Sequence, residues 1–93
     1  MRGGRISAEE NAEIRRMVRE AQSEADDFLY DTLSTIGRED LYGKGIELAA
    51  DYDSDEDMTY WYLIERGKDG VRFDIDGSMA ALEDAIWAAA RRH

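Results

Sequence analysis

The chain lacks cysteine and proline and has a single histidine among its 93 residues. Without cysteine, disulfides, thiol catalysis and cysteine-ligated zinc are excluded. No apolar run approaches the ~20 residues of a membrane span, and the start, from Met1 to Arg5, lacks the apolar segment of a secretory signal. These absences predict a cytoplasmic protein that has no membrane partner.

Positive charge is also scarce, since 22 Asp and Glu stand against 12 Lys and Arg and give a formal net charge of −10. Affinity for nucleic acid and for anionic membranes comes largely from Lys and Arg, so neither is expected as a direct ligand. The length suffices for one thin hydrophobic core. We therefore expect a single domain over residues 1–93.

Apolar periodicity predicts a long helix over residues 8–36. Its apolar side chains recur at helical spacing: Ile14, Met17, Val18, Ala21, Ala25, Phe28, Leu29, Leu33 and Ile36. The residues from Ser7 to Glu10 have the capping-box pattern at the start, and Gly37 is suited to end the helix. At about 43 Å this helix is long for a small domain, so a break within 22–27 stays open as an alternative.

Three strands and a second helix are predicted after a loop at 38–45. Residues 46–53 follow a period of two, with acidic side chains at three of the four outward positions and Ala49 at the fourth; residues 58–65 are apolar on both faces as in a central strand, and residues 71–75 alternate again. A hairpin turn is expected at 67–70. The last helix is expected to open at Gly77 and Ser78, with Ser78 or Asp76 as N-cap, and to bury Met79, Leu82, Ile86 and Ala89, with Trp87 at the border.

The predicted fold is α+β in the order α-β-β-β-α, with a three-stranded antiparallel sheet covered on one face by helices. Double-stranded-RNA-binding domains have the same order of elements. Their last helix needs a basic start to hold phosphates, whereas here the segment from Ser78 to Asp84 is acidic. RNA binding is therefore not expected from this topology.

Acidic charge is concentrated in residues 20–57, which hold thirteen acidic and two basic residues. On the predicted helix, one row of charges spans about 33 Å at the helical rise. Its members recur at spacings of three or four: Glu9, Glu13, Arg16, Glu20, Glu24, Asp27 and Asp31. Like-charge neighbours four apart cost about 0.2–0.5 kcal/mol each. Helix stability alone would have favoured lysine at several of these positions.

A second acidic segment runs from Asp51 to Asp57. If it is extended, its four aspartates at odd positions point the same way about 6.8 Å apart. Each row then has roughly half the linear charge density of a DNA strand, and two rows side by side approach it. A solvated acidic surface is the plainer interpretation, and a salt-adapted or GC-rich origin also fits, since Lys44 and Lys68 are the only lysines.

Signatures of catalysis and metal binding are missing. The segment from Asp51 begins like a calcium loop, but Glu56 stands at the sixth position, which needs Gly, and Tyr62 at the twelfth, which needs Glu. The only histidine is His93, the last residue, which is expected to be mobile. We expect no catalytic residues, no metal site and no cofactor.

Trp61 stands between Tyr60 and Tyr62, so its side chain leaves the central strand on the face opposite to theirs. If helices cover both faces of the sheet, all three rings are buried. Otherwise, Trp61 and Leu63 form an exposed aromatic patch of the type that anchors protein interfaces. Both arrangements stay open on sequence alone.

The chain is one compact α/β domain without Cys or Pro, and its acidic residues are concentrated at Glu20–Asp31 and Asp51–Asp57. In these general properties it resembles, as a class, the small acidic phage proteins that inhibit host nucleases, including anti-CRISPR and anti-restriction proteins. The resemblance implies binding, in the host cytoplasm, to a CRISPR effector or restriction enzyme and occlusion of its DNA or guide-RNA groove. The expected function is inhibition of a basic nucleic-acid-binding protein by carboxylates that take the place of phosphates.

The residues expected to contact such a partner are Glu20, Glu24, Asp27, Asp31, Asp51, Asp53, Asp55, Glu56, Asp57 and Trp61. An alternative function is a protein-interaction or assembly domain, in which the helix 8–36 and Trp61 meet a cellular partner or a second copy in a homodimer, and acidity serves solubility. A third is an antitoxin-like or immunity protein that neutralises a basic nuclease by the same physics.

Overall fold

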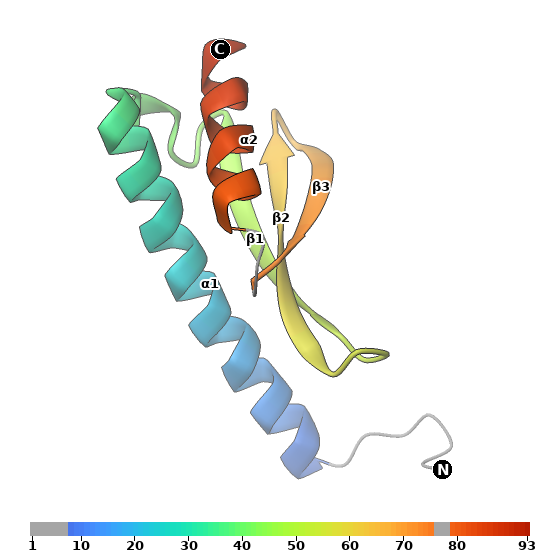
Figure 1. Ribbon diagram of the computed structural model, residues 1–93. Coiled ribbons are helices and arrows are strands. Elements are labelled where there is room, and N and C mark those ends of the chain that lie inside the picture. The colour runs from blue at the N-terminus through green and yellow to red at the C-terminus, as the bar shows by residue number, and fades with distance from the viewer. Residues whose placement is uncertain (1–7, 76–78) are drawn as a thin grey trace.

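The computed structural model describes residues 8–75 and 79–93, which fold as two α-helices, three strands and one short 3-10 helix (Figure 1). In chain order these are α1 (Ala8–Ile36), η1 (Glu39–Leu41), β1 (Ile46–Asp53), β2 (Met58–Glu65), β3 (Lys68–Asp74) and α2 (Met79–Arg91). The predicted α+β class and the α-β-β-β-α order are confirmed. The 3-10 helix lies within the segment 38–45 that the sequence predicts as a loop.

The first helix, α1, is continuous over its whole length, so the alternative with a break within 22–27 is wrong. No glycine or proline interrupts its sequence, and such residues are the commonest sites of a kink. Ala21 and Ala25 are buried where the helix meets the sheet, and their small side chains fit this contact without bending the helix. The expected cap, Ser7, lies outside the described residues.

The C-terminal end of α1 confirms the role predicted for Gly37, which has a φ of +83°. Its N–H donates to the carbonyl of Ser34 at 3.0 Å, and the next N–H, of Arg38, donates to the carbonyl of Leu33 at 2.8 Å. This pair of bonds is a Schellman motif, which satisfies carbonyls that the helix end leaves without partners.

The strands form one antiparallel sheet in the order β1-β2-β3, so β2 is central as predicted. The turn between β2 and β3 differs from the prediction. It consists of Arg66 and Gly67, whose φ values of 51° and 77° are both positive, as a two-residue type I′ turn requires. The turn expected at 67–70 is wrong because Lys68 already pairs with Glu65 in the sheet.

Gly70 lies inside β3, where the β2–β3 register shifts between Tyr62 and Ile64. A Cβ atom at Gly70 would lie 2.5 Å from the carbonyl oxygen of Leu63, so only glycine permits this close approach of the two strands. Gly70 suggested a turn in the sequence, but the structure requires it for the register shift between β2 and β3.

Both helices lie on the same side of the sheet, and the hydrophobic core fills the space between the two layers (Figure 1). The buried strand residues share one face of the sheet, and the core comprises Ala21, Ala25, Leu29, Leu33, Leu41, Ile46, Leu48, Trp61, Leu63, Phe73, Leu82, Ile86, Ala89 and Ala90. Trp87 is 37% exposed at the border of α2, as predicted. The expected one-sided helical cover is confirmed, and the other face of the sheet is open.

Gln22 of α1 closes the free edge of β1. Its side-chain amide donates from Nε2 to the carbonyl of Leu48 at 2.7 Å, and its Oε1 accepts the N–H of Ala50 at 2.8 Å. The amide thus makes the pair of hydrogen bonds that a neighbouring strand would make. An edge strand with free backbone groups is a template for aggregation, and this contact covers two of those groups.

Replacing Gln22→Leu is expected to lower the free energy of unfolding by about 1–3 kcal/mol, because two half-buried backbone groups of β1 lose their partners. Urea unfolding followed by circular dichroism measures the loss. Ser23→Ala, at an exposed neighbouring position of α1, is the matched control and should change stability little. Equal stability of the two variants would contradict the role of Gln22 at the sheet edge.

Candidate functional site: an acidic helix face and a cationic pocket

All six carboxylates of the predicted row on α1 are exposed. At its N-terminal end, Glu13 forms an ion pair with Arg16 at 3.7 Å. Farther along, the row is purely acidic, and we call this part the acidic helix face: Glu20, Glu24, Asp27 and Asp31. No ion pair within residues 8–75 and 79–93 involves any of these four side chains.

The acidic helix face has a regular geometry because α1 is unbroken. Its members recur at spacings of four, three and four residues, which places them within about 60° of arc on the helix. They cover about 16 Å along the axis, or one carboxylate per about 5.5 Å. The buried residues Ala21, Ala25 and Leu29 lie on average about 130° around α1 from the centre of this row, so the carboxylates point away from the sheet.

The segment Asp51–Asp57 is not an extended row. The strand β1 ends at Asp53, and residues 54–57 form the turn to β2. The Oδ1 atom of Asp53 accepts the N–H groups of Asp55 at 2.9 Å and Glu56 at 3.3 Å, which folds the chain back on itself. Asp57 has a φ of 55° and accepts a hydrogen bond from the hydroxyl of Tyr52. The expectation that four aspartates point the same way is therefore wrong.

Arg72 of β3 neutralises much of this second acidic segment. Its guanidinium contacts Asp53 at 2.7 Å, Glu56 at 2.7 Å and Asp74 at 2.9 Å, and lies 4.2 Å from the centre of the Tyr60 ring. The hydrogen bond from Arg72 holds the pKa of Asp53 below its ordinary value. The same contacts, with Asp53 first and Asp74 second, raise the pKa of Arg72. These carboxylates hold the sheet and its turn together.

The sequence left open that the two acidic segments lie side by side. In the structure they do not. The pairing of Asp51 with Tyr60 and of Ala50 with Trp61 places Asp51 and Asp53 on the face of the sheet that the helices leave open. The acidic helix face points outward from the other layer. Asp55 is exposed in the turn, but it does not belong to an evenly spaced row of carboxylates.

Trp61 is buried at 2% exposure, and its Nε1–H donates to the carbonyl of Ala21 in α1 at 3.1 Å. Leu63 is buried beside it. The prediction that Trp61 and Leu63 form an exposed patch is therefore wrong, because these residues face the helices. Helical cover of both faces is also wrong, since the open face carries Tyr60 and Tyr62, whose ring centres lie 6.1 Å apart.

Acid is expected to weaken the stabilisation that Arg72 provides. Because the pKa of Asp53 is lowered in the folded state, its carboxylate stabilises the fold above the ordinary Asp value of about 3.9 and ceases to do so as the pH falls through the lower folded pKa. Arg72→Gln should therefore lower the Tm at about pH 7 and change it much less at about pH 2.5. Thermal unfolding followed by circular dichroism measures both.

The control for this pH dependence is Arg91→Gln, which removes the same charge from an exposed site near the end of α2. It should alter the Tm little at either pH. An Arg72→Gln variant that lost as much Tm in acid as at neutral pH would show that the arginine acts through its packing on Tyr60 and not through the carboxylates.

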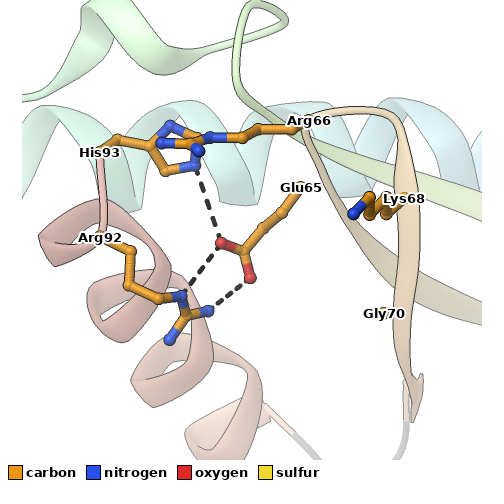
Figure 2. A pocket seen from close by; sticks show the side chains of 6 residues that line it. All are labelled: Glu65, Arg66, Lys68, Gly70, Arg92 and His93. Carbon is orange, nitrogen blue, oxygen red and sulfur yellow. Dashed lines mark hydrogen bonds and ion pairs between the residues drawn. The ribbon is translucent and has the colours of Figure 1, made fainter.

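Three cationic side chains and His93 line a pocket with Glu65 at the opposite end of the sheet from the β1–β2 turn, a cluster that the sequence did not predict (Figure 2). We call this site the cationic pocket, a cavity of about 580 Å³ lined by Glu65, Arg66, Lys68, Gly70, Arg92 and His93. Arg92 donates to both carboxylate oxygens of Glu65, and the His93 Nε2 lies 3.7 Å from Oε2. The contact with Arg92 lowers the pKa of Glu65.

His93 is held in place, contrary to the expectation that it is mobile. Its side chain is only 9% exposed and packs against Gly45, where an added Cβ would lie 3.1 Å from the ring. Arg38 donates to the carbonyl of His93 at 3.1 Å and so ties this end of the chain to the segment after α1. No sequence motif signals this contact, because its residues are far apart along the chain.

Within residues 8–75 and 79–93, no group of three or more His, Asp or Glu side chains is arranged to hold a metal ion. No helix among these residues is both long and apolar enough to cross a membrane. Comparison of the chain with protein-family models, with curated proteins and with solved structures finds no match in any of the three.

Proposed function

We propose that this protein binds a basic nucleic-acid-handling protein, of the CRISPR-effector or restriction-enzyme type, and inhibits it by occupying a groove that normally receives phosphates. The acidic helix face carries the proposal. Its four exposed carboxylates lie along one rigid helix and form no ion pairs among the described residues, so they are available to arginines of a partner. Carboxylates accept bidentate bonds from arginine as phosphates do.

The charge spacing on α1 is regular but wider than that of a nucleic acid, since no second acidic row among the described residues lies beside it. One carboxylate per about 5.5 Å on the helix compares with one phosphate per ~3.4 Å on a single DNA strand. The formal charge of −10 adds long-range attraction to a basic partner and speeds its encounter. The like-charge spacing of Asp27 and Asp31 is unfavourable for the free helix and favourable when a cationic groove covers it.

The test is an affinity pulldown with the immobilised protein from a nuclease-rich lysate, at low and at high salt. The proposal expects a basic nucleic-acid-binding protein in the low-salt fraction, its release at high salt, and loss of its nucleic-acid binding when this protein is added. A captured partner whose activity on nucleic acid is unaffected would contradict inhibition by occupation of the groove.

A second candidate function is an assembly domain that acts through the open face of the sheet. The observation that favours it is the aromatic pair Tyr60 and Tyr62, which no helix covers and which has Arg72 stacked on one ring. Light scattering separates the two functions. A tight dimer whose formation buries the open sheet face, or the acidic helix face, would favour assembly over inhibition.

A further inference from the structure

The cationic pocket concentrates positive charge in a protein that is otherwise strongly acidic. Among the described side chains that line it, Arg66, Lys68 and Arg92 supply three positive charges and Glu65 one negative charge, with His93 as a further neighbour (Figure 2). Arg92 is engaged by Glu65. By contrast, Arg66 and Lys68 are exposed and form no ion pair among the side chains that the structure describes, which do not include that of Asp69.

The backbone at Arg66 supplies an independent observation. Arg66 occupies the first position of the type I′ turn with a φ of 51°, in the left-handed region where Asn, Asp or Gly is favoured. A bulky residue kept there costs conformational energy, and such strain is concentrated at functional sites. The turn places Arg66 in the lining of the pocket, at a position where asparagine would make a better turn and provide no charge.

The kind of ligand follows from the shape and the charge of the site. A cavity of about 580 Å³ is the size of a small-molecule site. An acidic protein or a nucleic acid would be repelled by the molecule's overall negative charge, whereas a compact anion meets mainly the local cations. A lysine beside an arginine is a common combination for phosphate, since it joins a point charge to a planar fork.

We propose that the cationic pocket binds the phosphate group of a small phosphate monoester, through Arg66 and Lys68, with Arg92 positioned by Glu65 behind them. The carboxylate of Glu65 orients Arg92 through two hydrogen bonds and partly neutralises it. Gly70 also lines the cavity, and its lack of a side chain is required by the close approach of β3 to Leu63. This site shares no residue with the acidic helix face, so either proposal can fail while the other stands.

The experiment is a titration of the isotopically labelled protein, followed by nuclear magnetic resonance, with adenosine 5′-monophosphate at physiological salt. The proposal expects saturable shifts confined to residues 65–70 and 92–93, with a Kd of about 1 mM or tighter. Citrate and a 5′-phosphorylated oligonucleotide serve as competing probes. Absence of saturation, equal affinity for citrate, or tighter binding of the oligonucleotide would each overturn the proposal of a small phosphate ester.

Arg66→Asn is the decisive variant because asparagine followed by glycine is the preferred type I′ turn, so its fold should be at least as stable. Its affinity for the monophosphate should fall about tenfold, as should that of Lys68→Ala. Arg91→Gln, which removes one charge outside the pocket, should bind normally. Unchanged affinity in Arg66→Asn, with its Tm retained, would show that the pocket is not the binding site.

Discussion

Replacing Asp27→Lys and Asp31→Lys together is expected to weaken binding to the basic partner by at least about 100-fold and to leave the circular dichroism spectrum unchanged. Each carboxylate that meets an arginine contributes roughly 1.5–3 kcal/mol, and the reversal adds repulsion to this loss. Both side chains are exposed and make no core contact, so the helix should persist. Isothermal titration calorimetry with the captured partner measures the change.

The matched control is the double reversal Glu83→Lys and Asp84→Lys, which changes the net charge by the same amount at two exposed positions of α2. It should weaken binding only modestly, by reducing the long-range attraction. An equal loss in the two double variants would mean that bulk charge, and not the spacing on α1, is recognised. The proposed mimicry of phosphates would then be wrong.

The structure makes the second acidic segment unsuitable for such a test. Reversal of Asp53 would break its bond to Arg72 and its two bonds to backbone N–H groups in the turn, so lost binding could reflect lost structure. Asp55 is the better position there, because its side chain is exposed in the turn and is not among the ion-pair partners of Arg72. We expect Asp55→Lys to affect binding less than either change on α1.

The sequence predicted the elements of the fold because hydrophobic periodicity reports burial directly. Nine apolar positions at helical spacing and a glycine at 37 are enough to define α1, and alternation is enough to place β1. Errors arose where one residue type serves two purposes. Gly67 and Gly70 both suggested a turn, but only Gly67 is in it, and Gly70 relieves a close contact between strands.

The candidate site was less predictable because charges pair through space. The acidic helix face depends only on helical spacing, so it could be identified from sequence. The neutralisation of Asp53 by Arg72 depends on the register of three strands, and the cationic pocket joins residues from a turn, two strands and the two residues after α2. Because side chains alternate between the two faces of a strand, the sequence places Trp61 and Tyr60 on opposite faces of the sheet. Only tertiary packing decides which of these faces the helices cover.

Trp61→Ala is expected to be the most destabilising single substitution, with a loss of about 3–5 kcal/mol, because it leaves a large cavity between α1 and the sheet. The whole stability of such a domain is about 5–15 kcal/mol, so the variant should be partly unfolded at physiological temperature. Trp61→Phe keeps most of the buried ring and should lose about 1 kcal/mol with the hydrogen bond to Ala21. Urea unfolding measures both losses.

Trp87 is the natural control, since it is 37% exposed at the border of α2 and Trp87→Ala should cost far less. Fluorescence can also distinguish the environments of the two tryptophans, Trp61 and Trp87. In Trp87→Phe the remaining Trp61 should emit at short wavelength and resist quenching by iodide, whereas in Trp61→Phe the remaining Trp87 should be quenched. Ready quenching of Trp61 would place its ring at the surface, which would restore the exposed patch and remove the packing that fixes α1 on the sheet.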